Sequence, residues 1–243
     1  MAQRADLILV HRGLFESRSK ARAAIDAGLV LANGVLVTKP AEPIDDDALI
    51  EARPEHPWVS RAGMKLDAAL DLFGIDPNGR TCLDVGASTG GFTQVLLARG
   101  ATAVYAVDVG HDQLHVKLRD DPRVTAMEGV DARSLAPDMF AMPIGLVVCD
   151  ASFISLRLIL PTPLALAAPG AFLIALIKPQ FEVGRARVGK NGIVRDSRAH
   201  EDACFDARAL LGLLGWRVLG VEPSPIHGGD GNREFLIAAR KPE

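Results

Sequence analysis

Short apolar segments alternate with helical segments over residues 59–243. The apolar segments lie at 81–85, 103–108, 124–127, 144–150, 171–177, 216–221 and 234–239. Hydrophobic residues between them follow helical spacing, and residues 60–73 are predicted to form an amphipathic helix. Strands that alternate with helices are typical of βαβ units. The pattern therefore predicts an α/β fold with a largely parallel sheet.

Residues 4–50 have a different pattern, that of two short helices and a hairpin. The apolar positions of the first predicted helix, which ends near Gly13, are Leu7, Ile8, Val10 and Leu14. Ser17 is suited to cap a second helix, which ends at Gly28 and buries Ala21, Ala24 and Ile25. Asn33-Gly34 is typical of a type I′ hairpin turn. We predict a small α+β domain over residues 1–53, a linker over 54–58 and the α/β domain over 59–243.

Composition limits the class of protein. The chain has 243 residues, of which 49% are hydrophobic, and its net charge is −3, so any basic binding surface must be local. The three cysteines are scattered, which fits a reducing cytoplasm, and the histidines show no metal-ligand spacing, so no metal is expected. Residues 158–177 carry no charge, but prolines and Gly170 divide them. We therefore expect a helix, a Pro-Gly turn and a strand there, and no membrane span.

Basic residues gather in the N-terminal segment. Residues 1–39 contain six basic against three acidic residues, and the basic ones are Arg4, Arg12, Arg18, Lys20, Arg22 and Lys39. Such residues on a small helical module can follow an RNA phosphate backbone. Charge alone favours an ordinary solvated helix face, and both interpretations stay open at this point.

A glycine-rich turn follows the first predicted strand of the α/β domain. It reads Gly86-Ala87-Ser88-Thr89-Gly90-Gly91 and leads into a helical segment at 92–98. A dinucleotide turn would have a second glycine two positions after the first, and a P-loop would contain Gly-Lys-Ser/Thr. Asp84, just before the turn, suits a cationic ligand better than a pyrophosphate. We interpret the turn, from Asp84 to Gly91, as a site for S-adenosylmethionine rather than for a dinucleotide.

Further carboxylates lie at or near the ends of the next strands. Asp108 lies about twenty residues beyond the turn, a spacing that suits hydrogen bonds to ribose hydroxyls, and Asp131 is placed to accept from an adenine amino group. Each could instead cap a helix or lie in a solvated loop. Their recurrence at strand ends favours a nucleoside pocket, because ligands of parallel sheets bind at that edge.

The motifs resemble known families. The segment from Arg12 to Pro40, with Ser17-Arg18, Gly28 and Asn33-Gly34, is similar to an S4 RNA-binding domain. The glycine turn resembles the first motif of class I methyltransferases, a resemblance that implies a mostly parallel seven-stranded sheet. Lys65, Asp150, Lys178 and Glu234 resemble the Lys-Asp-Lys-Glu tetrad of FtsJ-type ribose 2′-O-methyltransferases.

That resemblance implies roles for the tetrad. Lys178 would act as the general base or orient the ribose hydroxyl, and Asp150 would set the charge state of the lysines. Lys65 and Glu234 would fix the network and position the ribose. The alternative is that Lys65 and Glu234 are ordinary surface residues and that Asp150 caps a helix.

The order of an S4-like module and an FtsJ-like domain resembles the TlyA, or hemolysin A, family. Segments that agree are 83–93, 150–155 and 178–184. The resemblance implies methylation of a cytidine 2′-hydroxyl in ribosomal RNA or a ribosomal subunit. The ends of the chain resemble those of the shorter members, so we expect 23S rRNA, with 16S rRNA and the oligomeric state left open.

Two further stretches bear on the substrate. Arg61, near Lys65, and the glycine-rich loop with Arg185, Arg187 and Lys190 are additional candidates for RNA binding. His227 is expected to be a loop residue without chemistry. Two other functions remain in view: an RNA-binding protein with a degenerate methyltransferase domain, and a membrane-lytic protein. The second would require a spanning or strongly basic amphipathic segment, which the pattern does not show.

Overall fold

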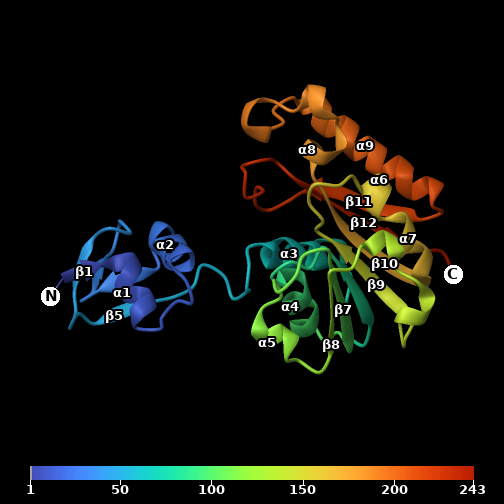
Figure 1. The fold of residues 1–243 in the computed structure, drawn as a ribbon. Coiled ribbons are helices and arrows are strands. Elements are labelled where there is room, and N and C mark those ends of the chain that lie inside the picture. The colour runs from blue at the N-terminus through green and yellow to red at the C-terminus, as the bar shows by residue number, and fades with distance from the viewer. Residues whose placement is uncertain (1) are drawn as a thin grey trace. The chain divides into compact units, whose positions relative to one another are not determined.

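The computed structural model describes residues 2–243, which form two compact units divided between Pro57 and Trp58 (Figure 1). The division falls inside the segment 54–58, where composition places a linker. Each unit has its own hydrophobic core.

The first unit contains two helices and two small sheets. Its elements are β1 (Ala2–Arg4), α1 (Ala5–His11), α2 (Arg18–Asp26), β2 (Val30–Ala32), β3 (Val35–Leu36), β4 (Pro43–Asp45) and β5 (Ile50–Ala52). β1 pairs with β4, and β2 lies between β3 and β5, all antiparallel. Asn33 and Gly34 have φ of 51° and 76°, as the predicted hairpin turn requires.

The buried face predicted from the sequence is correct for α2 and only partly correct for α1. Ser17 caps α2, since its Oγ accepts a hydrogen bond from the Lys20 backbone N–H at 3.3 Å, and the predicted inner face of α2 is buried. In α1 the predicted inner face is partly wrong, because Leu7 is 39% exposed and Leu14 lies beyond the helix. The buried apolar positions are Ala5, Ile8 and Leu9, which share one face of a two-turn helix.

The second unit is a seven-stranded sheet between two layers of helices. The strands are β6 (Thr81–Val85), β7 (Ala103–Asp108), β8 (Val124–Glu128), β9 (Ile144–Cys149), β10 (Ala167–Ile177), β11 (Arg217–Pro223) and β12 (Phe235–Arg240). The helices are α3 (Ala62–Phe73), α4 (Gly91–Ala98), α5 (Val116–Arg119), α6 (Leu156–Ile159), α7 (Pro161–Leu166), α8 (Pro179–Glu182) and α9 (Ser197–Leu213). Short 3₁₀ turns are η1 (Ala132–Ser134), η2 (Pro137–Met139), η3 (Arg185–Arg187) and η4 (Lys190–Gly192).

The strand order is β11-β12-β10-β9-β6-β7-β8, and the strands from β10 to β8 are parallel. β12 lies between β10 and β11 and runs antiparallel to both. The predicted α/β class with a largely parallel sheet is therefore confirmed.

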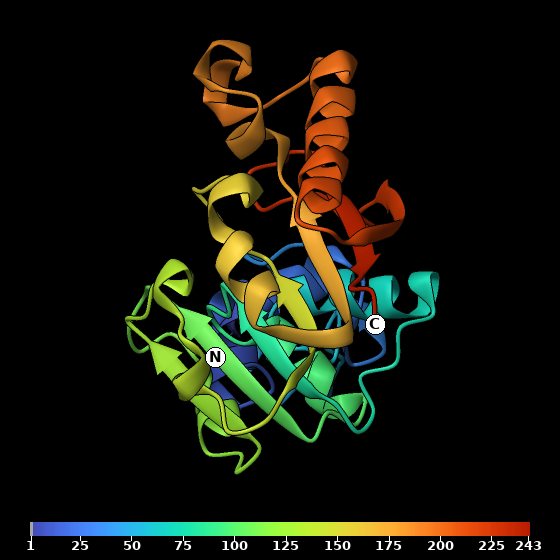
Figure 2. The same ribbon diagram turned by 90° about the vertical axis from the view of Figure 1, so that its right-hand side faces the viewer.

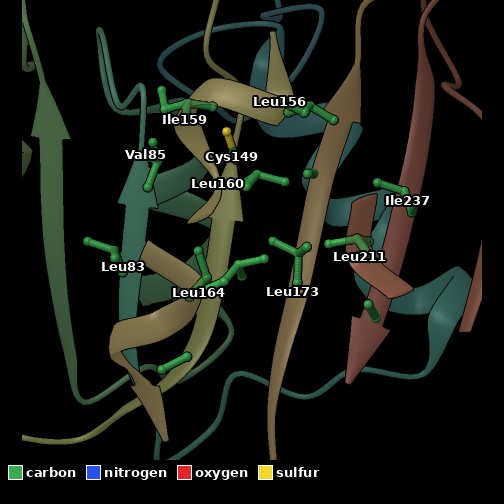
Figure 3. Packing of buried hydrophobic residues seen from close by; sticks show 14 of the residues in the cluster. Leu83, Val85, Cys149, Leu156, Ile159, Leu160, Leu164, Leu173, Leu211 and Ile237 are labelled. Atoms are coloured by element: carbon green, nitrogen blue, oxygen red, sulfur yellow. The ribbon is translucent and has the colours of Figure 1, made fainter. Parts of the chain in front are cut away.

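Strand residues alternate between two hydrophobic cores. Odd-numbered residues such as Leu83, Leu173 and Ile237 pack against α6, α7 and α9, as the side chains in Figure 3 show. Even-numbered residues such as Leu146 and Leu236 pack against α3, α4 and α5. This alternation, with a period of two, is what places the ionisable residues described below on one face.

One predicted element differs. β10 begins at Ala167 and passes through Pro169 and Gly170, where the sequence pattern predicts a Pro-Gly turn after a helix. The register against β9 shifts between Ala167 and Phe172, and an irregularity of this kind accommodates a proline within a strand. The preceding helical segment is divided into the short helices α6 and α7. Within residues 2–243, none of the helices is both long and apolar enough to cross a membrane.

Candidate functional site

Four ionisable residues reach the same face of the sheet at the same edge: Asp84, Asp150, Lys178 and Glu234. Asp84 lies in β6, and Asp150 and Lys178 directly follow β9 and β10. β12 runs the opposite way and begins at that edge, where Phe235 pairs with Ile177, so Glu234 arrives there as well. All four continue the even-numbered positions that face α3 and α4. The tertiary structure thus assembles residues that are far apart in the sequence.

Lys65 and Glu234 form a buried ion pair. Lys65 extends from α3, and its Nζ lies 2.5 Å from Glu234 Oε2. The two residues are 7% and 3% exposed. Partnered burial of this kind holds both side chains in place, because breaking it would leave an uncompensated charge inside the protein.

Lys178 is held by three oxygen atoms. Its Nζ lies 2.8 Å from Asp150 Oδ1, 3.1 Å from the Asp150 carbonyl oxygen and 2.8 Å from Ser152 Oγ. The ammonium donates hydrogen bonds to the Asp150 carbonyl oxygen and to Ser152 Oγ, and it pairs with the Asp150 carboxylate by charge. The amine therefore has a fixed direction at the end of β10.

Two pockets meet beside these lysines. The smaller, about 290 Å³, is lined by Lys65 and Lys178 together with residues of the glycine turn and the loop 226–229. The larger, about 620 Å³, lies over β6, β7 and the loops that follow β8 and β9. The pockets share four lining residues: Gly86, Ser88, Asp150 and Ser152. A group bound in one pocket would therefore approach a group bound in the other across a common wall.

The glycine turn has the backbone that the sequence indicates. Gly86 has φ of 82°, and a Cβ there would lie 2.9 Å from the backbone of Ala151. Gly90 has φ of 92° and is the N-cap residue of α4, and a Cβ there would collide with Leu118. Asp108 fastens the turn, since its carboxylate accepts the backbone N–H groups of Ser88 and Gly110, each at 2.8 Å.

The candidate cofactor residues do not all lie in the same wall. Gly86, Ser88, Asp108 and Asp131 line the larger pocket, whereas Ala87 and Thr89 line only the smaller one. Asp84, Gly90 and Gly91 are not among the residues that line either pocket.

Asp131 is already engaged by a cation. Its Oδ2 lies 2.6 Å from Arg133 Nη2, and it also caps η1 by accepting the Arg133 backbone N–H. The hydrogen bonds from Arg133 lower the pKa of Asp131 to about 2. A ligand donor at Asp131 would thus meet a firmly ionised acceptor.

Asp84 stands behind the pocket wall and is fully buried. Its Oδ2 accepts a hydrogen bond from the Thr93 hydroxyl at 2.7 Å, while its Oδ1 has no partner among the described residues. Burial raises the pKa of Asp84 to about 7, the nearby Asp150 adds to this, and the Thr93 hydrogen bond opposes it.

Three of the basic candidates in the first unit converge on one carboxylate. Arg4, Arg18 and Arg22 all donate to Asp6, whose side chain is closed off from solvent while theirs stay about half exposed. We call this group the Asp6 cluster. Each arginine uses its Nε and Nη2 edge toward Asp6, which leaves Nη1 directed elsewhere.

The other basic candidates of the first unit differ in whether they bind other residues of the protein. Lys20 pairs with Glu16 at 2.6 Å, and Arg12 donates to the carbonyl oxygens of Ala48 and Asp46. Lys39 is exposed. Arg12 therefore holds the backbone of the segment 46–48 by hydrogen bonds, in addition to any contact with RNA.

In the second unit, Arg61 lines the smaller pocket and donates to the His227 carbonyl oxygen at 3.1 Å. Arg185 and Lys190 are exposed on η3 and η4. Arg187 instead pairs with Asp196 and Asp202, which ties this loop to α9, and Figure 2 shows the two segments side by side. Of these loop residues, Arg185 and Lys190 have the better access to a ligand.

Sequence reasoning missed several residues of the pockets. Ser152 holds Lys178 and lines both pockets, and Phe153 lines the larger one with φ of 65° and 89% exposure. His227, expected to be a plain loop residue, lines the smaller pocket. The only signal for Ser152 in the sequence was its place two residues after Asp150. A single serine in a loop carries little information by itself. Over residues 2–243, no cluster of three His, Cys, Asp or Glu residues suits a metal ion.

A parallel sheet of this strand order, with a glycine turn, strand-end carboxylates and an adjoining lysine pocket, defines a Rossmann-like methyltransferase. Comparison with known families agrees. Residues 58–241 match the FtsJ-like methyltransferase family and residues 3–50 match the S4 domain. The chain belongs to the FtsJ-like methyltransferase family and carries an S4 domain, which confirms the family and the enzyme class predicted from the motifs.

Individual relatives cover most of the chain. It is 44% identical to the 16S/23S rRNA (cytidine-2′-O)-methyltransferase TlyA of Mycobacterium tuberculosis, over 99% of this chain and 91% of that protein. It is 38% identical to the 23S rRNA (cytidine-2′-O)-methyltransferase TlyA of Campylobacter jejuni, over 74% of this chain and 69% of that protein. A solved structure of a protein named as a hemolysin from Streptococcus thermophilus has a TM-score of 0.78 and 43% identity, covering 100% of this chain and 89% of that one.

Proposed function

We propose that this chain transfers a methyl group from S-adenosylmethionine to the 2′-hydroxyl of a cytidine in 23S ribosomal RNA. The observation that supports this most is the common wall of the two pockets, formed by Gly86, Ser88, Asp150 and Ser152. Direct methyl transfer needs a donor and an acceptor held in contact and in line, and adjoining pockets provide that arrangement. Both TlyA relatives described above are named for cytidine 2′-O-methylation of 23S rRNA.

The larger pocket fits the proposed methyl donor. Its volume of about 620 Å³ lies within the usual range for small-molecule sites. Asp108, Asp131 and Asp150 line it, and its one lining cation, Arg133, is neutralised by Asp131. An acidic lining favours a ligand with a sulfonium and an ammonium group over one with a pyrophosphate. S-adenosylmethionine, when bound, supplies an electrophilic methyl group on a positively charged sulfur.

Asp108 and Gly86 would hold the donor by different means. Asp108 has lone pairs left after accepting two backbone N–H groups, and these can accept from ribose hydroxyls. Gly86 and Ala151 both line the pocket, and the absence of a side chain at Gly86 lets its backbone pack directly against that of Ala151.

The lysine pocket would receive the ribose. A 2′-hydroxyl is a weak nucleophile, so its attack needs removal of the proton and alignment of the oxygen. Lys178 as a neutral amine would accept that proton, or as an ammonium it would orient the hydroxyl, with the substrate oxygen taking the place of one of the three oxygen atoms around Nζ. Lys65, held by Glu234, would present its remaining N–H donors to the same ribose.

RNA binding would be divided between the two units. The half-exposed arginines of the Asp6 cluster offer guanidinium groups for the phosphate backbone, and Arg185 and Lys190 offer exposed charges on η3 and η4 of the second unit. A degenerate, non-catalytic methyltransferase domain is disfavoured, because both lysine–carboxylate pairs are intact and the pockets adjoin. As a ribosomal RNA enzyme, the protein would act in the cytoplasm.

A test compares Lys178→Met with the matched control Lys117→Met, since Lys117 is an exposed lysine of the same unit. Transfer of a tritiated methyl group to 23S rRNA should fall by about a thousandfold in Lys178→Met, as loss of a general base or its equivalent typically does. The affinity for S-adenosylmethionine should stay within about threefold of the unchanged protein, and the control should resemble it in both respects.

Retention of more than about a tenth of the rate in Lys178→Met would remove Lys178 from the chemistry. No transfer by the unchanged protein to free 23S rRNA, to 16S rRNA or to either ribosomal subunit would contradict the proposed function itself. Labelling of 16S rRNA as well would extend the substrate range, and mapping the mark to a base other than cytidine would contradict the assignment.

A further inference from the structure

Two segments beside the pockets are connected by a row of side-chain contacts. One is the loop 150–156, between β9 and α6, and the other is the segment 178–182, which contains α8. Lys178, at the start of the second segment, binds Asp150 and Ser152. Glu182, at its end, binds the far side of the same loop.

The Glu182 contacts are short and involve both carboxylate oxygens. Oε2 accepts a hydrogen bond from the Ser155 hydroxyl at 2.6 Å, and Oε1 accepts the Leu156 backbone N–H at 2.9 Å. Leu156 is the first residue of α6, so Glu182 satisfies a donor that has no partner within that helix. Ser155 in turn caps α6 through the Arg157 N–H. Between the two ends, the rings of Phe153 and Phe181 lie 5.2 Å apart.

The loop needs such support because its backbone is strained. Phe153 has φ of 65°, a conformation that residues with a side chain rarely adopt and that costs on the order of 1 kcal/mol or more. A strained conformation persists only where contacts on both sides determine it. Lys178 supplies those contacts on the N-terminal side of Phe153, and Glu182 supplies them on the C-terminal side.

The loop also forms pocket wall. Residues 150–154 all line the larger pocket, and Asp150 and Ser152 line the smaller one too. Glu182 is absent from the lining of both, so any effect it has must act through the loop.

We propose that Glu182 is a positioning residue that fixes the loop 150–156, and through Asp150 and Ser152 the direction of the Lys178 amine. The catalytic consequence rests on the proposed function, whereas the ordering of the loop does not. Burial raises the pKa of Glu182, and the hydrogen bonds from Ser155 and Leu156 oppose that rise. A side chain that replaces Glu182 must therefore still bond to the Ser155 hydroxyl and the Leu156 N–H.

The test compares Glu182→Ala and Glu182→Gln with the control Glu201→Ala, an exposed glutamate on α9. Gln keeps a carbonyl oxygen for the Leu156 N–H, and its amide can donate to the Ser155 hydroxyl. Amide hydrogen exchange at residues 151–157, measured without added S-adenosylmethionine, should speed up about tenfold or more in Glu182→Ala, but not in Glu182→Gln or the control. The maximal rate of methyl transfer should fall about thirtyfold in Glu182→Ala and return to within about threefold in Glu182→Gln.

Ser155→Ala provides a second variant should Glu182→Ala unfold. It should speed exchange at Leu156 in the same direction by a smaller factor, and its effect should not add to that of Glu182→Ala. Unchanged exchange at 151–157 in folded Glu182→Ala would overturn the proposal, as would a maximal rate equal to that of the control. If the unchanged protein methylates no ribosomal RNA, the proposed function fails, while the exchange result still decides the role of Glu182 in ordering the loop.

Discussion

Asp6 in the first unit and Asp84 in the second are both closed off from solvent, yet their pKa values shift in opposite directions. Hydrogen bonds from Arg4, and then from Arg18 and Arg22, hold the pKa of Asp6 well below its usual range despite the opposing effect of burial. Burial raises the pKa of Asp84 to about 7, because its hydrogen-bond partner is the neutral Thr93 hydroxyl. Loss of solvent contact therefore does not decide the charge of a carboxyl group; its partners do.

The two aspartates also differ in what surrounds them. Asp6 is covered by guanidinium groups that are themselves about half exposed, so a cluster with three cations and one anion remains at the surface. Asp84 lies within the sheet under α4, among apolar residues. The first arrangement leaves a surplus of positive charge at the surface, whereas burial in the second raises the pKa of a carboxyl group behind the wall of the larger pocket.

The largest expected effect comes from Asp84→Asn, which resembles the protonated acid in shape. The folded-state pKa of Asp84, about 7, lies above the unfolded value of about 3.9. Its contribution to stability is therefore full below about pH 4 and is lost as the pH rises through about 7. Relative to Asp84→Asn, the unchanged protein should lose about 3 kcal/mol of unfolding free energy between pH 5 and pH 8. Denaturant titrations over that range, without ligand, measure it, and parallel curves for the two proteins would refute the pKa assignment.

Asp6→Asn tests a stability contribution whose pH dependence has the opposite sign to that of Asp84. Because the folded-state pKa of Asp6 is depressed, its contribution is present above the unfolded pKa of about 3.9 and is lost as the pH falls below it. The melting temperature of the first unit should drop by about 5 °C at pH 7, with the difference shrinking toward pH 3. Heating while following the amide signals of residues 5–26 measures this unit alone, and Asp26→Asn, at the exposed end of α2, is the control. A difference that persists unchanged at pH 3 would mean that Asp6 is not ionised.

Arg22→Gln is expected to have the smallest effect, and it acts on binding. Removal of one cation from the Asp6 cluster should weaken ribosomal RNA binding about fivefold and reduce the salt slope of the affinity by about one. Arg22→Lys keeps the charge and should keep the slope, although it loses the fork that contacts Asp6. Equal slopes for Arg22→Gln and the unchanged protein would place the RNA on another surface.

Much of the fold is predictable because its determinants are local. The Ser17 cap, the Asn33-Gly34 turn and the left-handed Gly86 each depend on a few neighbouring residues. The strand segments are recognisable from their apolar runs, and their lengths agree with β6 and β7 to the residue. Where the local pattern misleads, as at Pro169 and Gly170, pairing of Ala167 with Ile144 of β9 extends a strand that the proline alone would end.

The site likewise has features that local sequence predicts and features that depend on the tertiary structure. The sequence alone determined which chemistry-bearing side chains fall at the carboxyl ends of strands, since strand ends and the period of two can both be read from it. Only the tertiary structure decided the partners: Lys65 with Glu234, 169 positions apart, three arginines for Asp6, and the neutral Thr93 hydroxyl for Asp84. It also brought Ser152 to the Lys178 amine and Glu182 to the Ser155 hydroxyl. Local preferences extend over a few residues, whereas a partner is chosen by strand order and by the face that each strand presents, which no short stretch of sequence contains.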